Sequence, residues 1–185
     1  MRTRFRWTGF VLAMTVVAAE LPGQQVPVPK NGSSADRVIS GGAIIMPGMS
    51  PERDAMAVVD KLFDAMRAGD STAVRSVFAD GALLGSIETK DGASSLKKDP
   101  GGVDGFVKAV GSPHQALWDE RTANAKIHVD GDLAMVWVDY TFYLGERKSH
   151  CGVDAFQLVK GADGWKVVTL VDTRRRENCP EIPKR

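Results

Sequence analysis

Polar and aromatic residues recur at every second position between residues 137 and 143. Trp137, Asp139, Thr141 and Tyr143 alternate there with apolar residues, and a period of two is typical of a β-strand whose two faces differ. One face of this strand would carry a carboxylate, a hydroxyl, a phenol and an indole ring. Flat apolar walls with a few hydrogen-bonding groups are typical of a pocket for a small organic ligand.

Residues on the next strand extend this set if the two strands form a tight hairpin. Gly145-Glu146 suits a two-residue turn, and such a turn fixes the pairing of the strands on either side. The partners predicted in this way are Thr141 with His150, Asp139 with Gly152, and Trp137 with Asp154. A slip of one residue would move the second strand's side chains to the opposite face, so the set depends on this register.

A histidine beside a carboxylate can transfer protons, because the carboxylate fixes the imidazole tautomer and raises its basicity. Asp139, His150 and Asp154 are therefore the acid–base candidates, and Gly152 would leave room for a ligand close to Asp139. Two alternatives stay open. The set can form a pocket that binds without reacting, or a polar strand surface with a structural role, which is the commonest role of such residues.

A basic run follows the last expected strand. Arg174, within Asp172-Thr173-Arg174-Arg175-Arg176, is a candidate to hold an anionic group of a ligand. The alternative is an ion pair with Asp172 or Glu177, which is the more common role of a charged strand end. No set of Cys and His residues has metal-ligand spacing, and no Gly-rich phosphate loop follows a strand, so the sequence predicts neither a metal nor a cofactor.

Helices precede the strands that would carry these residues. Ser50-Pro51 suits a helix start, the apolar stripe of Val59, Leu62, Phe63 and Met66 has helical spacing, and Gly69 suits the helix end. The other elements expected are a short helix capped by Asp70 or Ser71, a strand over 83–88, a third helix over 103–110, and strands over 118–129, 133–144, 149–160 and 165–173. Helices followed by a long antiparallel meander predict an α+β fold with helices on one face of a curved sheet.

The N-terminal segment has the pattern of a signal peptide. Arg2, Arg4 and Arg6 precede an apolar run that ends in small residues at Ala19, and this run is too short for a membrane span. We expect a signal peptide over 1–19, cleaved after Ala19 or else Gly23. An uncleaved anchor is the alternative. A Pro-, Gly- and Ser-rich spacer over 20–50, a domain over 51–180 and a tail over 181–185 would follow.

The charge balance argues against a nucleic-acid partner. The formal charge is +1, and removal of the three N-terminal arginines with the signal peptide takes it to −2. Such a protein has no basic surface for phosphates. No other stretch is long enough to span a membrane, so we expect an exported, periplasmic or secreted protein without a stable span after cleavage.

Cys151 and Cys179 are the two cysteines of the chain. An even number of cysteines in an exported protein predicts a disulfide. A tight turn over 161–164 would place Cys151 opposite Arg174, so the bond requires the segment before Cys179 to curl back over the sheet. Two free thiols are the alternative.

The chain resembles the nuclear transport factor 2-like superfamily, with its cystatin-like cone, and within it the SnoaL-like and lumazine-binding proteins. The likeness spans about residues 51–179 and rests on stretches 60–70 with 78–80, 129–137, 150–158, and 164–167 with 172–175. It implies a cone that holds a small organic ligand, and a homodimer built on the open sheet face. Because this superfamily includes isomerases, dehydratases, cyclases, hydrolases, transport adaptors and binding modules, the resemblance leaves binding, cofactor-free catalysis and dimeric interaction open as functions.

Overall fold

The computed structural model describes residues 50–184. The expected signal peptide over 1–19 and the expected spacer, except for Ser50, lie outside the described residues. The elements are α1 (Pro51–Ala68), α2 (Ser71–Val77), β1 (Phe78–Lys90), β2 (Ala93–Lys98), α3 (Gly102–Val110), β3 (Trp118–Asp130), β4 (Leu133–Leu144), β5 (Arg147–Gly161) and β6 (Gly164–Thr173). Among residues 50–184, no helix is both long enough and apolar enough to cross a membrane.

The first helix begins and ends at the residues that the sequence predicts, and the second begins after one of its two predicted caps. The Ser50 Oγ accepts a hydrogen bond from the Arg53 amide at 3.3 Å. Gly69 ends α1 with a φ of 68°, a left-handed conformation that favours glycine. Asp70 then caps α2 by accepting a hydrogen bond from the Ala73 amide at 2.9 Å. These local signals explain why α1 and α2 form a helical hairpin.

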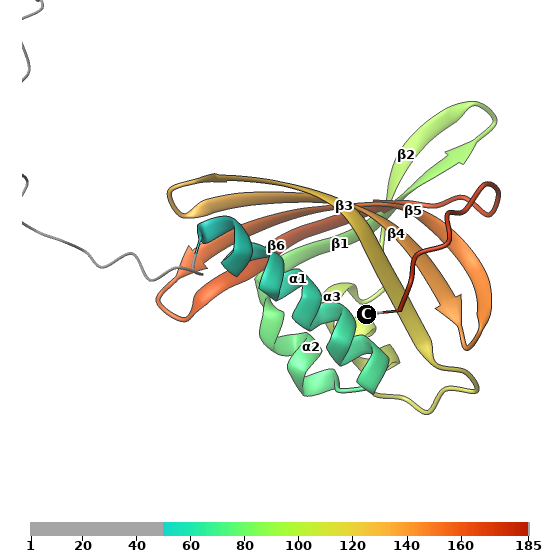
Figure 1. The fold of residues 1–185 in the computed structure, drawn as a ribbon, viewed down its shortest axis with the longest axis horizontal. Helices are drawn as coiled ribbons and strands as arrows, with labels where there is room; N and C mark the ends of the chain where they lie inside the picture. The colour runs from blue at the N-terminus through green and yellow to red at the C-terminus, as the bar shows by residue number, and fades with distance from the viewer. Residues whose placement is uncertain (1–49, 185) are drawn as a thin grey trace, which may run out of the picture. The chain divides into compact units, whose positions relative to one another are not determined.

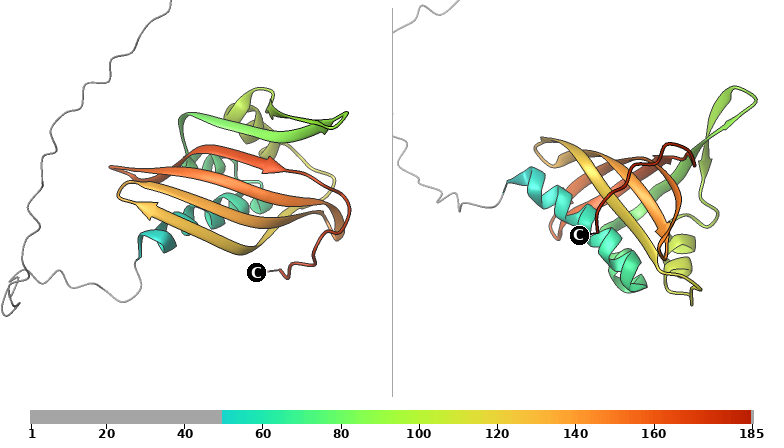
Figure 2. Two further views of the ribbon diagram at one scale, coloured as in Figure 1. Left: turned by 90° about the horizontal axis from the view of Figure 1, so that it is seen from above. Right: turned by 45° about the vertical axis from the view of Figure 1, so that its right-hand side comes forward.

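The strands form a six-stranded sheet in the order β2-β1-β6-β5-β4-β3. The predicted antiparallel meander β3-β4-β5-β6 is confirmed, and β1 joins it by pairing in parallel with β6. All three helices lie on one side of the curved sheet (Figures 1 and 2). The sequence did not predict β2, whose six residues are all exposed and therefore show no alternation of apolar and polar side chains.

The core lies between α1 and the sheet. The predicted stripe of α1 is buried against the middle strands, where the Phe63 and Phe156 rings meet edge to face at 6.1 Å. Val136, Val138 and Tyr140 of β4 point to this side and are 0%, 0% and 1% exposed. We call the side of the sheet that faces the helices the inner face and the other side the outer face.

The predicted register between β4 and β5 is wrong by one residue beyond the turn. Leu144 pairs with Arg147 as predicted, and Tyr143 pairs with Lys148, but Phe142 then pairs with His150. Ser149 is the extra residue of a β-bulge, and each bulge changes the face on which the following side chains lie. This bulge was not predictable from the sequence, because neither glycine nor proline marks it.

Candidate functional site

A cavity of about 560 Å³ opens between α1, α3 and the inner face of the sheet. Its walls are mostly apolar and aromatic, with Met66 from α1, Phe106 from α3, and Trp118, Phe142 and Leu144 from the sheet. The Trp118 and Phe142 rings are 6.2 Å apart and meet edge to face. This volume and lining are typical of a site for a small organic molecule.

The inner end of this cavity is polar. A narrow extension of about 70 Å³ continues the cavity toward the core, and both parts share Met66, Asp99, Phe106, Glu120, His150 and Arg174 as lining residues. Tyr140, Asp154 and Asp172 line the extension. A ligand in the cavity would therefore have an apolar environment over most of its surface and hydrogen-bonding groups at one end.

Asp172 is the best satisfied of the carboxylates at this end. It accepts hydrogen bonds from the Ser86 hydroxyl at 2.5 Å and from the Arg174 Nε at 2.6 Å. The Tyr140 hydroxyl lies 3.1 Å from the Asp172 Oδ2 and 2.9 Å from the Thr173 carbonyl oxygen, and can donate to either. Burial raises the pKa of Tyr140, and the negative charge of Asp172 raises it further, so this phenol stays protonated.

Asp154 lies directly across from Asp172 on the neighbouring strand. The Asp154 side chain is buried, and its Oδ2 accepts no hydrogen bond from any N–H or O–H group of residues 50–184. The carboxyl group of Glu120 lies close enough to form a hydrogen bond with Asp154. Because two carboxylates cannot donate to each other, that bond requires one of the two groups to carry a proton.

Burial is the main reason why the pKa values of both carboxyl groups are raised. Burial raises the pKa of Glu120 to about 7, with the nearby charge of Asp172 adding to the effect. Burial, followed by the charge of Glu120, raises the pKa of Asp154 well above its ordinary value. Glu120 and Asp154 therefore act as one carboxyl pair that shares a proton, like two acids forced into one desolvated site.

His150 also faces the cavity, but in aromatic rather than acidic surroundings. Its ring lies 5.0 Å from the Phe142 ring and 5.8 Å from the Tyr140 ring, and its Nδ1 lies 3.1 Å from the Ser149 Oγ. Burial lowers the pKa of His150, and the positive charge of Arg174 lowers it further. The imidazole is therefore neutral at neutral pH.

The structure divides the predicted cluster between the two faces of the sheet. His150 and Asp154 are on the inner face, whereas Trp137, Asp139, Thr141 and Tyr143 are on the outer face. The bulge at Ser149 is the reason. The pairing of Asp139 with His150 as an acid–base couple is thus wrong.

The outer-face residues have partners of their own. The Asp139 Oδ2 accepts a hydrogen bond from the Asn124 Nδ2 at 2.9 Å, and Trp137 is 44% exposed. Gly152 does not leave room for a ligand, since a Cβ there would lie 1.8 Å from the Thr173 carbonyl oxygen. Gly152 instead permits the close approach of the β6 end.

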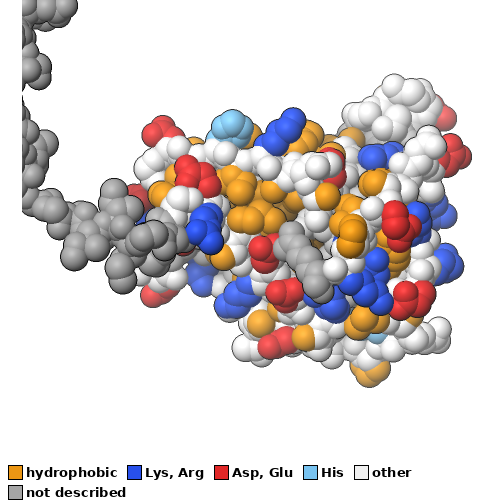
Figure 3. Space-filling view, viewed as in Figure 1, with side chains coloured by type: hydrophobic (Ala, Val, Ile, Leu, Met, Phe, Trp, Pro, Cys, Tyr) orange, Lys and Arg blue, Asp and Glu red, His pale blue; other side chains and the backbone are white. Residues whose placement is uncertain are grey.

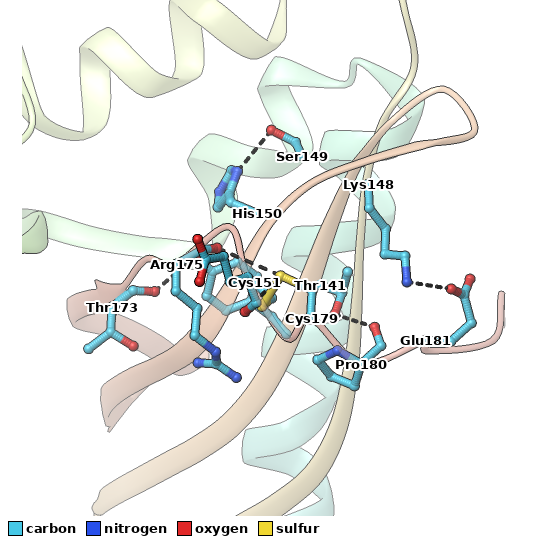
Figure 4. The surroundings of a disulfide bond; sticks show 12 residues. Thr141, Lys148, Ser149, His150, Cys151, Thr173, Arg175, Cys179, Pro180 and Glu181 are labelled. Carbon is cyan, nitrogen blue, oxygen red and sulfur yellow. Dashed lines mark hydrogen bonds and ion pairs between the residues drawn. A yellow bond between two sulfur atoms is a disulfide. The ribbon is translucent and has the colours of Figure 1, made fainter.

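The segment after β6 curls back over the outer face. The predicted disulfide between Cys151 and Cys179 is confirmed, with a Cα–Cα distance of 5.5 Å. Beyond it, the Thr141 hydroxyl donates to the Pro180 carbonyl oxygen at 3.0 Å (Figure 4). The Tyr143 hydroxyl donates to Glu181 at 3.0 Å. These contacts show that Thr141 and Tyr143 hold the C-terminal segment.

Arg121 and Ile182 complete the attachment of this segment. Arg121 donates to the Ile182 carbonyl oxygen at 3.1 Å, and the Ile182 side chain is buried. Acidic and basic side chains are interspersed around the segment (Figure 3), including the ion pairs Lys148–Glu181 and Lys184–Glu146. The tail expected to begin at residue 181 is therefore part of the packed surface.

Arg174 forms an ion pair and also lines the cavity. It pairs with Asp172, as one of the two alternatives predicted, and it also lines the cavity. The sequence pattern did not identify Glu120, Tyr140 and Asp172 as site residues. Glu120 offered a signal, because it shares a strand face with the large apolar side chain of Trp118, and an acidic residue pointing toward a core is uncommon.

Comparisons with solved structures show the fold. A protein of unknown function from Mycobacterium tuberculosis is 14% identical, with a TM-score of 0.55 over 68% of this chain and 72% of that one. A cystatin-like protein from Novosphingobium aromaticivorans is 10% identical, with a TM-score of 0.55 over 69% and 84%. Another cystatin-like protein, from Nostoc punctiforme, is 12% identical, with a TM-score of 0.52 over 68% and 91%.

No curated protein matches the chain. The family described as "Putative lumazine-binding" matches residues 50–171, which include α1 to α3 and nearly all of the sheet. The structural neighbours have the same cystatin-like, nuclear transport factor 2-like fold. The chain belongs to this lumazine-binding family of the nuclear transport factor 2-like superfamily.

Proposed function

We propose that this protein binds a small, partly apolar organic molecule in the cavity between α1, α3 and the inner face of the sheet. The observation that carries the proposal is the cavity itself, about 560 Å³ in volume, with aromatic walls and a polar inner end. A cavity of this size can enclose most of the surface of a small ligand. Among the candidates from the sequence, His150, Asp154 and Arg174 lie where they would contact it.

A fragment screen by thermal shift tests this function with a variant that fills the cavity. Ala109 of α3 lines the cavity, and Ala109→Phe would occupy space that the ligand needs. Ala162→Phe adds the same side chain at an exposed turn and is the matched control. We expect fragments to stabilise the wild type and Ala162→Phe but not Ala109→Phe. Equal stabilisation of all three proteins would place binding elsewhere.

A cofactor-free isomerase, dehydratase or cyclase is the second candidate function. The carboxyl pair supports it, because a group whose pKa lies near 7 can both give and take a proton at neutral pH. In this proposal Glu120 and Asp154 replace Asp139 as the acid–base groups, and His150 stays a candidate. Recovery of every bound fragment unchanged after incubation, with Asp154→Asn altering affinity alone, would rule the enzyme out.

Export is also a proposal. The basic and apolar pattern over residues 1–19 supports it, and the Cys151–Cys179 disulfide is compatible with an oxidising compartment. Mass spectrometry of the protein recovered from periplasm and medium would test it. A mature N-terminus at Glu20 or Gln24 is expected, and an intact chain retained in the cytoplasm would contradict export.

The homodimer stays a prediction. Its support is a group of apolar side chains on the outer face that are each more than two-fifths exposed, namely Leu133, Met135, Trp137 and Val159. Apolar surface of this kind is common at interfaces between protein chains. Sedimentation equilibrium of the wild type and of Trp137→Lys would show a dimer that the substitution weakens, and a monomer at all concentrations would contradict it.

A further inference from the structure

We propose that the cavity selects an organic cation, a primary or secondary amine on an apolar and preferably aromatic body. This inference rests on the proposed binding function and adds the charge class of the ligand. It follows from the charges at the inner end of the cavity, from one buried oxygen that no donor among the described residues reaches, and from the aromatic walls.

The inner end holds more acids than bases. The titratable and charged groups that face it, from every surrounding element, are Asp99, Glu120, Tyr140, His150, Asp154, Asp172 and Arg174. Four of these are carboxyl groups and one is a guanidinium, which Asp172 already engages at 2.6 Å. No salt bridge within residues 50–184 reaches Asp99, Glu120 or Asp154. The acidic groups that line the site therefore outnumber the basic ones.

Asp154 marks the position where a positively charged group of a ligand would bind. The residue is 3% exposed, and no donor within residues 50–184 reaches its Oδ2, although it lies at the polar end of the cavity. A buried carboxylate oxygen without a donor is costly, so a ligand that supplies one is favoured. An ammonium group brings up to three N–H donors, one of which this oxygen could accept, and a positive charge that balances the carboxyl pair once Glu120 has ionised.

The other ligand charges fit less well. An anionic group would enter next to Glu120, Asp154 and Asp172, and repulsion between like charges in a desolvated site is strong. A neutral hydroxyl would provide one hydrogen bond and leave the charge uncompensated. Among residues 50–184, no three His, Cys, Asp or Glu side chains are grouped so that they could hold a metal ion, which favours an organic cation.

The aromatic walls suit the rest of such a ligand. Trp118 and Phe142 meet edge to face at 6.2 Å, and Phe106 faces them from α3. Aromatic faces attract a cation and also bury an apolar body. The carboxyl pair would thus bind the ammonium at the inner end while the rings enclose the hydrocarbon part.

Binding would exchange one charge for another. Below pH 7 the empty site holds the Glu120 proton in addition to the one that Glu120 and Asp154 share. When an ammonium binds, this additional proton leaves to solvent and the ligand keeps its own, so up to one proton is released for each cation bound. Burial raises the pKa of Glu120 to about 7, so affinity for the cation should rise as pH increases toward this value, by up to about tenfold per pH unit.

Three indole probes of one shape but different charge test the inference. Tryptamine is cationic, tryptophol is neutral, and indole-3-propionate is anionic. Chemical shifts of the cavity residues would be followed during titration with each probe at pH 6 and pH 8. We expect tryptamine to bind at least tenfold more tightly than tryptophol at pH 8, with a smaller difference at pH 6, and the anion to bind most weakly.

Matched variants locate the effect. Asp154→Asn should remove the advantage of tryptamine and retain tryptophol binding, whereas Asp139→Asn on the outer face should leave the binding of all three probes unchanged. If tryptophol or indole-3-propionate binds as tightly as tryptamine at pH 8, the cation inference is wrong and the binding function stands. If no probe perturbs the cavity residues, the proposed binding function fails as well.

Discussion

The two faces of β4 and β5 carry similar residue types in different situations. On the outer face, Asp139, Thr141 and Tyr143 each have a hydrogen-bond partner, which is Asn124 or the C-terminal segment. On the inner face, Asp154 is buried with an oxygen that no donor of the described part of the chain reaches. The outer polar groups thus fix the fold, whereas the inner ones leave bonding capacity for a ligand.

Residue type alone therefore does not identify a site. A carboxylate with an amide partner at the surface contributes to local structure. A carboxylate beside a second acid in an apolar cavity is destabilising unless a proton or a ligand compensates its charge. The structure therefore distinguishes the faces by what remains unsatisfied.

Removal of the disulfide should have the largest effect on the outer face. Cys151→Ser with Cys179→Ser opens a loop of sequence separation 28, and a loop of this size contributes about 3 kcal/mol to the free energy of unfolding. Urea denaturation of the oxidised wild type and the double variant would measure the loss. The reduced wild type is the control, and a loss below about 1 kcal/mol would show that the outer contacts hold the segment unaided.

The carboxyl pair should make stability depend on pH. Because burial raises the pKa of Glu120 from 4.5 to about 7, its contribution is fully present below pH 4.5 and is lost as pH rises through 7. The free energy of unfolding should fall by on the order of 2 kcal/mol over this range, after allowance for the part of the Glu120 side chain that solvent reaches.

Urea denaturation at pH 5 and pH 8 would test this for the wild type and Glu120→Gln. The variant should lack this part of the pH dependence. Comparison of the two proteins also removes the contribution of His150, whose lowered pKa acts in the opposite direction. An identical pH dependence in both proteins would mean that Glu120 does not carry the shared proton.

Substitution of two tyrosines on the same strand allows a direct comparison of the two faces. Tyr140→Phe removes a buried hydroxyl from Asp172 and should cost about 1 to 2 kcal/mol of stability, and it should also alter ligand affinity. Tyr143→Phe removes a hydroxyl that bonds to exposed Glu181 and should cost less, with affinity unchanged. Equal effects of the two substitutions on affinity would remove the distinction between the faces.

Asp139→Asn should have the smallest effect. The amide can still accept the hydrogen bond from Asn124, so stability should change by less than about 0.5 kcal/mol. Any catalytic turnover found in this protein should also persist in the variant. A loss of turnover with Asp139→Asn, but not with Asp154→Asn, would restore the acid–base role predicted from the sequence.

The fold could be predicted from the sequence because its signals are local. The caps at Ser50 and Asp70, the stop at Gly69, and the alternation along β3 to β6 each depend on nearby residues. The site depended on pairing between strands. One unmarked bulge at Ser149 moved His150 and Asp154 to the inner face, and nothing local to either strand shows which face a bulged strand presents.

The proton shared by Glu120 and Asp154 is the feature that most clearly distinguishes the inner face from the outer face. Carboxyl ¹³C chemical shifts, followed from pH 3 to pH 9, would measure it directly. We predict that Glu120 titrates with a midpoint near 7 and that both carboxyl groups respond to the same coupled steps. Independent titration of the two groups, with Glu120 near its ordinary value of 4.5, would contradict the account.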